Sequence, residues 1–283
     1  MLRAQAVSLM SESAQALGPA FDPAAFEDSK PLGFSRRQAL TWAAGAAAVA
    51  SLAALGLPAA AGVVISTKRG EIRLAPLKDG STVLLNTESR IRVRYDRGRR
   101  FVTLLKGEAY FSVARDDPRP FVVEVDGRRL TTAQAGFRVR KLEGDPIDVL
   151  VDRGRVEVAP SRQARAVRID ANMRLALTDR LTTDNIHSIA PETVTRELAW
   201  REGKLAFEGE TLRQAADAFA RYSDTRIEIR DPALAREPVT GLFAANDPVG
   251  FGRAIARVFD ARLEQDGDEV VLSRGSPAPA AAQ

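Results

Sequence analysis

The sequence predicts a mainly β domain followed by a small α+β domain built from two βαβ units, with one N-terminal transmembrane helix ahead of both. Three observations carry this prediction. Residues 38–67 contain no charged side chain. From Val63 to about Thr183, apolar residues recur at every second position, as they do in half-buried strands. After Trp200 the apolar spacing changes to that of amphipathic helices between short strands.

The first 34 residues are short, polar and interrupted by three prolines. So few residues cannot build a hydrophobic core of their own. We therefore expect residues 1–34 to form a short tail.

The uncharged run is flanked by Arg36 and Arg37 on one side and by Lys68 and Arg69 on the other. At about 1.5 Å per residue, a helix over this run would be about 45 Å long, against about 30 Å for the hydrocarbon core of a bilayer. The length predicts a membrane span over residues 38–65.

A cleaved export signal is the alternative for the same run. The string SRRQAL, with Arg36 and Arg37 at its centre, resembles a twin-arginine export motif. The alanines at positions 59–61 provide small residues of the kind found at cleavage sites. A retained twin-arginine signal anchor and a signal cleaved near Ala61 both stay open.

Residues 66–183 are predicted to form the β domain. Ile91, Val93 and Tyr95 alternate with arginines, a pattern that predicts a strand with a solvated arginine face in an antiparallel pair. Glycine-containing turn signals recur about every ten residues, as in all-β folds. They include residues 78–81, 106–108, 126–127, 143–145 and 152–154.

Residues 184–199 are predicted to be a linker, and His187 a loop residue within it. His187 is the only histidine, and the chain has no cysteine. A single histidine without cysteine does not make a common zinc site, and no serine or carboxylate pattern points to a catalytic histidine.

Residues 200–274 are predicted to form the α+β domain. Thr211 and Gln214 have the spacing of a capping box at the start of one helix. Asp247 and Pro248 have the pattern of an N-cap followed by a proline at the first position of a second helix. Strands are expected on either side of each helix. The Pro/Ala-rich residues 275–283 are predicted to be disordered.

Composition excludes several functions. Without cysteine there is no disulfide, thiol nucleophile or Cys-based metal site. The net charge of +4 is spread along the chain, which argues against a nucleic-acid interface. None of the common nucleotide-binding, hydrolase or metalloprotease motifs is present. We therefore expect a protein that is not an enzyme and has no cofactor or metal.

An ordered series of short blocks resembles the FecR family over residues 66–158. The first blocks are Gly70-Glu71, Leu77–Ser81 and Leu84–Asn86, and the later ones are Gly107–Phe111, Arg119–Val123, Gly136–Val139 and Gly154–Val156. The signature residues, expected to be architectural, are Asp79, Gly80, Ser81, Asn86, Gly107, Glu108, Phe111, Arg119, Pro120 and Phe121. Within this set we expect turn glycines at 80 and 107, a strand start at Pro120, and core positions at Phe111 and Phe121 together with Phe137.

The region 200–274 is similar to the short N-terminal domain of secretins and TonB-dependent receptors. The two resemblances together imply a regulator of cell-surface signalling in the bacterial inner membrane, with its N-terminus cytoplasmic and its C-terminal domains periplasmic. Its implied partners are an extracytoplasmic-function (ECF) sigma factor and the signalling domain of an outer-membrane TonB-dependent transducer. Many members of the family respond to iron–siderophore uptake.

The chain departs from the FecR pattern before the membrane. The family carries a longer cytoplasmic part with a tryptophan-rich sigma-binding unit, whereas residues 1–34 contain no tryptophan. The expectation is therefore a cytoplasmic tail whose sigma-binding unit is missing or truncated. The alternative function is a twin-arginine-exported, soluble periplasmic binding or structural module without a sigma factor.

Overall fold

The computed structural model describes residues 62–95, 98, 100–116, 118–160, 166–177 and 185–274. The predicted tail, the export motif with Arg36 and Arg37, nearly all of the predicted span and the C-terminal residues 275–283 lie outside the described residues. Within the described ranges, no helix is long and apolar enough to cross a bilayer.

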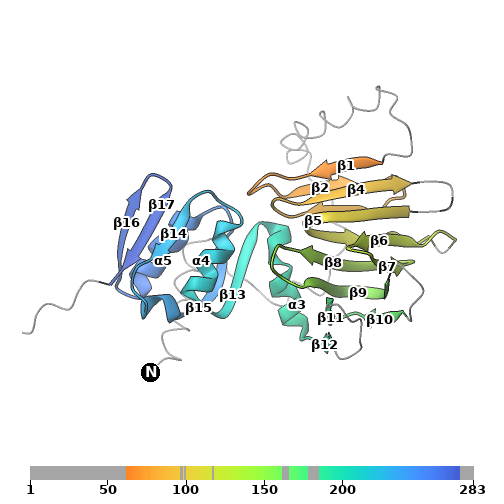
Figure 1. The fold of residues 1–283 in the computed structure, drawn as a ribbon. Coiled ribbons are helices and arrows are strands. Elements are labelled where there is room, and N and C mark those ends of the chain that lie inside the picture. The colour runs from red at the N-terminus through yellow and green to blue at the C-terminus, as the bar shows by residue number, and fades with distance from the viewer. Residues whose placement is uncertain are drawn as a thin grey trace, which may run out of the picture. The chain divides into compact units, whose positions relative to one another are not determined.

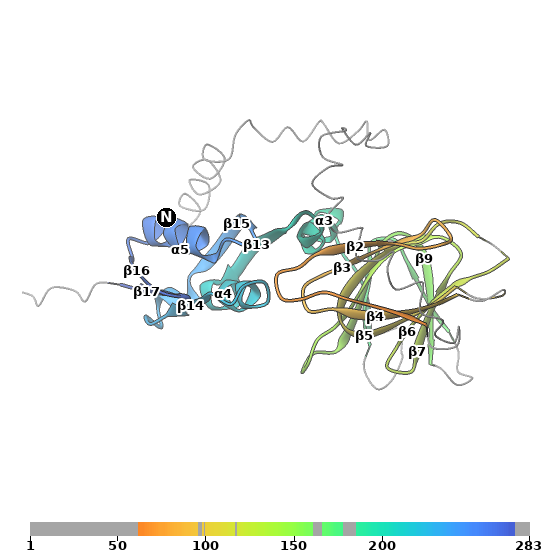
Figure 2. The ribbon, with the colours of Figure 1, turned by 90° about the horizontal axis from the view of Figure 1, so that it is seen from above.

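The predicted β domain is confirmed as a β-rich fold of two layers, formed from one continuous set of paired strands. The strands, in chain order, are β1 (Val63–Ser66), β2 (Arg73–Pro76), β3 (Thr82–Leu85), β4 (Arg90–Tyr95), β5 (Arg100–Ser112), β6 (Phe121–Val125), β7 (Arg128–Thr132), β8 (Ala135–Lys141), β9 (Ile147–Pro160), β10 (Val167–Asp170), β11 (Met173–Leu177) and β12 (Ile186–Ser188). Figure 1 shows their succession, and Figure 2 shows the layers, with β2 and β3 in one and β4, β6 and β7 in the other.

Two long strands belong to both layers. The first half of β5 pairs with β4 and β6, and its second half with β3 and β8. The first half of β9 pairs with β8 and β11, and its second half with β7 and β10. Strands that pass between sheets in this way bend at bulges. The pairing shifts register near Arg90 and near Gly136, where these bends occur.

Glycines make the two bends possible. Gly107 has φ +87° and Gly154 has φ +74°, a conformation that glycine adopts without steric cost. A Cβ atom at Gly107 would lie 2.5 Å from the Cα of Ser89. The predicted turns at residues 106–108 and 152–154 are therefore wrong, because both sit inside strands. A positive φ at a bulge and a positive φ at a turn select the same residue.

The core of the β domain lies between the layers. Phe111, Phe121 and Phe137 are fully buried in it, and the rings of Phe111 and Phe137 stack with centroids 5.1 Å apart. The strand β4 is antiparallel to β1 and β5, as predicted, and its arginines at positions 90 and 94 are exposed.

The domain begins earlier than predicted. Val63, Val64 and Ile65, the last residues of the predicted span, form strand β1 and pair with β4. The predicted linker is also structured. It contains β12, where His187 pairs with Arg174 of β11, and helix α3 (Pro191–Glu197), which is followed by the 3-10 helix η4 (Ala199–Glu202). His187 is thus a strand residue rather than a loop residue. Short strands and one-turn helices give too little periodicity to be recognised.

The C-terminal α+β module follows the predicted element order. Its elements are β13 (Lys204–Thr211), α4 (Leu212–Ala220), β14 (Arg226–Ile229), the 3-10 helix η5 (Leu234–Arg236), β15 (Pro238–Ala244), α5 (Pro248–Val258), β16 (Arg262–Asp266) and β17 (Glu269–Ser273). The side chain of Thr211 and that of Gln214 form the predicted capping box at α4. Asp247 caps α5, and Pro248 follows it at the first helical turn.

The pairing within the module differs from that of two separate βαβ units. Strand β13 pairs with β15, while β14 and β16 both pair with β17. The strands on either side of α4 therefore belong to different sheets. The periodicity of a sequence predicts strands and helices, but it does not say which strands pair. Phe207, Phe219 and Phe251 fill the module's core.

Candidate functional site

An apolar cluster joins the β domain to the segment that follows it. Its buried members are Tyr110, Leu150, Val194, Leu198, Trp200, Tyr222 and Ala245. They come from β5, β9, α3, η4 and the module. Burying side chains of this size removes a few hundred Å² from water and stabilises the contact. We call this contact the junction, because it connects the β domain to the module.

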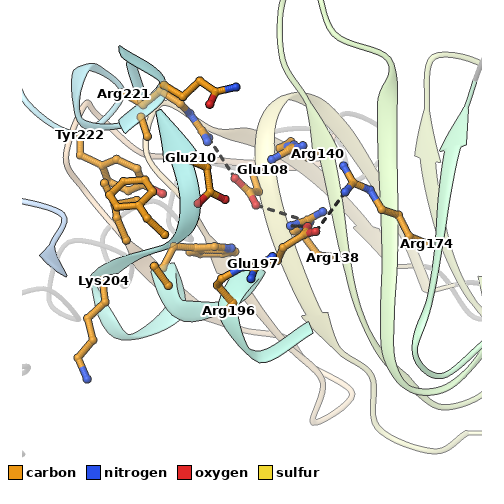
Figure 3. Close-up of a pocket in the computed structure, with 16 residues that line it drawn as sticks. Glu108, Arg138, Arg140, Arg174, Arg196, Glu197, Lys204, Glu210, Arg221 and Tyr222 are labelled. Atoms are coloured by element: carbon orange, nitrogen blue, oxygen red, sulfur yellow. Dashed lines mark hydrogen bonds and ion pairs between the residues drawn. The ribbon is translucent and has the colours of Figure 1, made fainter. Parts of the chain in front are cut away.

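Glu108 lies at the centre of the charged groups around this cluster. It is 2% exposed, and its Oε2 accepts hydrogen bonds from Asn86 Nδ2 at 2.9 Å and from Arg221 Nη2 at 3.0 Å. Its Oε1 lies 3.7 Å from Arg138 Nε. Figure 3 shows Glu108 between Arg221 and Arg138. One carboxylate of β5 thus contacts both β8 and the end of helix α4.

Arg138 extends the same network toward helix α3. It is 1% exposed, forms an ion pair with Asp148, and has its Nη1 2.9 Å from an oxygen of Glu197. Arg174 of β11 contacts both of these carboxylates, Asp148 at 2.5 Å and Glu197 at 3.1 Å. Burial opposes the charge on Arg138, but the carboxylates of Glu108, Asp148 and Glu197 outweigh it and raise the pKa of the guanidinium.

A second set of contacts fixes the end of helix α4. The hydroxyl of Tyr222 accepts a hydrogen bond from Asn86 Nδ2 at 2.8 Å, and the hydroxyl of Thr87 donates to the carbonyl of Arg221 at 2.8 Å. Burial, with the nearby carboxylate of Glu108, raises the pKa of Tyr222 to about 12. Gly70 has φ +73°, and a Cβ there would lie 2.6 Å from the carbonyl oxygen of Tyr222. Only glycine fits at this close approach.

A cavity of about 320 Å³ opens beside these groups. Its lining includes cationic and acidic side chains and an apolar wall; the residues are Glu108, Arg138, Arg140, Arg174, Arg196, Glu197, Trp200, Lys204, Leu205, Ala206, Phe207, Glu210, Gln214, Ala218, Arg221 and Tyr222. No serine, cysteine or histidine is among them, so the lining lacks the usual nucleophile and base of acyl transfer. The part of the chain that the structure describes also contains no group of side chains suited to hold a metal ion. The arrangement is suited to binding and to holding elements together.

The structure separates the signature residues into two groups. Asn86 and Glu108 lie at the junction, with exposures of 0% and 2%. The others lie within the β domain. Gly80 is in the turn between β2 and β3 with φ +83°. Pro120 directly precedes β6, and Arg119 forms an ion pair with Asp116.

Asp79 and Ser81 belong to a second buried charge centre. Asp79 forms an ion pair with Arg100 at 2.8 Å and accepts hydrogen bonds from the hydroxyls of Ser81 and Tyr95. Burial alone would raise the pKa of Asp79, but the hydrogen bonds from Ser81, Arg100 and Tyr95 hold it below its usual range. Burial also raises the pKa of Tyr95, and Asp79 adds to that shift. All these groups lie in the β domain.

Sequence reasoning missed most of the junction. Its unpredicted members include Arg138, Asp148, Arg174, Glu197, Trp200, Arg221 and Tyr222. One local signal was available for Arg138, which sits at a strand position between the core residues Phe137 and Val139. Such a residue faces away from the core and is normally solvated. Nothing local indicates that α3 and the module cover it.

Comparisons with known proteins are consistent with this architecture. A family model described as FecR protein matches residues 63–157. Two crystal structures of a proposed anti-sigma factor from Parabacteroides distasonis, at 2.50 and 1.65 Å resolution, share the fold with a TM-score of 0.58 and 23% identity. Each match covers 76% of this chain and 99% or 100% of the other. No curated protein sequence matches the chain.

Proposed function

Since its β domain is a FecR domain, we propose that this chain is an anti-sigma regulator of cell-surface signalling. In this proposal it crosses the bacterial inner membrane once, with its N-terminus cytoplasmic and the described domains periplasmic. It takes a signal from an outer-membrane TonB-dependent transducer, of the kind used in iron uptake, and controls an ECF sigma factor. The observation that carries the proposal is the FecR match, which covers the β domain up to the strand β9.

The fold of the remaining part supports the same proposal. The likeness to the solved structures covers 76% of the chain, which is more than the β domain alone. Those structures are of a proposed anti-sigma factor, and the regulatory role is carried from them to this chain as part of the proposal.

The junction gives the relay a physical route. A partner that binds the module acts on helix α4, and the end of α4 is tied to the β domain through Arg221 with Glu108 and through Tyr222 with Asn86. Buried, hydrogen-bonded contacts change between discrete arrangements rather than stretch. A displacement of α4 would therefore change the contacts of Glu108 on β5.

Strand β15 is the proposed docking edge for the transducer. Among the described strands it pairs with β13 alone, and its Leu242 is 47% exposed. An unpaired edge can accept a strand from a partner through main-chain hydrogen bonds. The signalling domain of the transducer would add a strand there.

Capture of the two partners tests the proposal. The full chain is immobilised and exposed in turn to the signalling domain of a TonB-dependent receptor and to an ECF sigma factor, both from the same bacterium. We expect both to be retained. Leu242→Asp should weaken capture of the signalling domain, because a buried charge at the new strand pair is unfavourable.

A matched control uses the same change elsewhere. Leu74 on β2 is 55% exposed and belongs to the β domain, so Leu74→Asp should leave capture of the signalling domain unchanged. Retention of neither partner, with a known regulator pair binding under the same conditions, contradicts the relay. Equal loss in both variants contradicts docking on β15.

Cell fractionation tests the proposed location. The full chain should be recovered with the inner membrane, and replacement of Arg36 and Arg37 by lysines should block export if the twin-arginine motif is used. Replacement of Arg90 and Arg94 by lysines is the control, because both are exposed on β4. A mature protein that begins near Gly62 and is free in the periplasm would contradict the relay and favour a released module.

A further inference from the structure

The cavity at the junction contains hydrogen-bond donors that lack acceptors. Among the described residues, two buried side-chain atoms have no hydrogen-bond partner, the Nε of Arg138 and the Nε1 of Trp200. Both residues line this cavity, and they are 1% and 4% exposed. Leaving a buried donor without an acceptor is destabilising, because the group loses its hydrogen bonds to water and gains none. The Nε of Arg138 faces Glu108 Oε1 at 3.7 Å, so the indole N–H of Trp200 is the donor that an acceptor from outside the chain would satisfy.

The acidic side chains of the cavity are already engaged. Glu108 binds Asn86 and Arg221, and Glu197 binds Arg138 and Arg174. The third, Glu210, accepts a hydrogen bond from the backbone of Glu208. None of these contacts reaches the indole of Trp200.

Arg140 adds a further donor. Its ion pair with Asp148 is long, at 3.9 Å, and it goes to an oxygen that Arg138 also contacts. Its side chain is 27% exposed and lines the cavity. A planar guanidinium with free N–H groups binds a carboxylate or phosphate through two parallel hydrogen bonds.

Hydrogen bonding, rather than net charge, is what favours an anion here. Six cationic and three acidic side chains line the cavity. Cations among them form ion pairs with acids outside the lining, which are Asp148, Glu202 and Glu208. The positive charge is therefore largely balanced, and the lining has more hydrogen-bond donors than acceptors. The apolar side of the lining, made by Leu205, Ala206, Phe207 and Ala218, suits a hydrocarbon body.

We propose that this cavity is a binding site for a small organic carboxylate. The carboxylate would accept hydrogen bonds from Trp200 and Arg140, and its hydrocarbon part would lie against the apolar wall. Because the lining includes residues of β8, η4, β13 and α4, a bound carboxylate would contact both the β domain and the module and stabilise the contact between them. The site does not depend on the proposed sigma-factor function.

The resonance of the Trp200 indole N–H provides a direct test. The chain has two tryptophans, so the full chain with Trp42→Phe, in one neutral detergent, gives a single indole signal in a ¹H–¹⁵N spectrum. Titration with butyrate should shift this signal downfield and saturate. Butyramide, which has the same shape without the charge, and sodium chloride at equal ionic strength should not.

Two variants assign the site. Arg140→Gln should weaken butyrate binding about tenfold, the loss expected for one charge-assisted hydrogen bond. Arg94→Gln on the exposed face of β4 should leave it unchanged. Trp200→Phe should also reduce binding. Because this variant lacks the indole signal, its binding is measured as the butyrate-dependent rise in the melting midpoint. Far-UV circular dichroism establishes that each variant is folded.

Three results would overturn the proposal. The first is the absence of a saturable indole shift with butyrate. The second is equal binding by the Arg140→Gln and Arg94→Gln proteins, which indicates general ionic effects. The third is saturable binding of inorganic phosphate with no response to butyrate, which indicates a site for phosphate and not for organic acids. These results are independent of whether a sigma factor or a transducer is captured.

Discussion

Among the described residues of the β domain, two arginines are buried, Arg100 and Arg138, each 1% exposed and each paired with at least one carboxylate. The partners of Arg100 all belong to the β domain. Its guanidinium contacts Asp79 at 2.8 Å and donates to the carbonyls of Arg119 and Ala114 at 2.7 and 2.9 Å. This arrangement ties strand ends and loops of one domain together.

Arg138 differs in where its partners come from. Glu108 and Asp148 lie in β5 and β9, whereas Glu197 lies at the end of α3, outside the β domain. One of its nitrogens has no hydrogen bond, and a cavity lies alongside. A closed, local charge centre stabilises a fold, while an open centre shared between segments can respond to what binds there. The comparison therefore predicts a structural role for Arg100 and a coupling role for Arg138.

Arg138→Met should have the largest effect. Removing the cation leaves Glu108, Asp148 and Glu197 facing one another, and breaking a buried ion pair from one side costs about 3–5 kcal/mol. Urea unfolding of the Trp42→Phe protein is followed by Trp200 fluorescence, which reports the junction, and by far-UV circular dichroism, which reports the sheets. We expect the fluorescence transition to move to lower urea than the dichroism transition. Coincident transitions would contradict a coupling role.

Arg100→Met should destabilise by about 3 kcal/mol, because one buried carboxylate and several carbonyls lose their donor. Here the two transitions should shift together, since the β domain supports the junction and unfolds as a unit. Arg94→Met on the exposed face of β4 should change neither by more than about 0.5 kcal/mol. If the fluorescence and dichroism transitions separate in the Arg100→Met protein as well, the two arginines do not differ in role.

The sequence predicted the core of this molecule better than its junction. Alternation identified β4, the FecR-like blocks identified the buried phenylalanines, and cap residues located the starts of α4 and α5. These features depend on residues close together in the chain. The bends at Gly107 and Gly154 were mistaken for turns because both need a positive φ.

The junction depends on contacts between residues far apart in the chain. Glu108 and Arg221 are 113 positions apart, and Asn86 and Tyr222 are 136 apart. An arginine in a strand has the same local pattern whether water or another element covers it. The resemblance to the FecR blocks did include Asn86 and Glu108, but only the structure places them against α4.

Tyr222→Phe and Tyr95→Phe make the same deletion at the two centres. The Tyr95 hydroxyl donates to the carboxylate of Asp79 at 2.8 Å, so its loss should cost about 1.5–3 kcal/mol. The Tyr222 hydroxyl accepts from Asn86, whose amide also donates to Glu108. Loss of the Tyr222 hydroxyl should lower the free energy of unfolding by about 1 kcal/mol. It should shift the urea transition followed by Trp200 fluorescence more than the transition followed by circular dichroism. A larger loss for Tyr222→Phe than for Tyr95→Phe would reverse the ranking of the two centres.

Acid should weaken the Arg100 centre, and this is the smallest expected effect because it depends on one carboxyl group. Hydrogen bonds hold the pKa of Asp79 below its ordinary value of 3.8 despite burial. A lowered folded-state pKa contributes stability that is complete above the unfolded-state value and is lost as the pH falls through the folded-state value. The stability difference between the native protein and Asp79→Asn should therefore be constant near neutral pH and shrink below about pH 4. Asp268→Asn, in the exposed turn between β16 and β17, is measured alongside as the control for removing a surface carboxylate. A difference for Asp79→Asn that does not change with pH would mean that Arg100 is held by its carbonyl contacts alone.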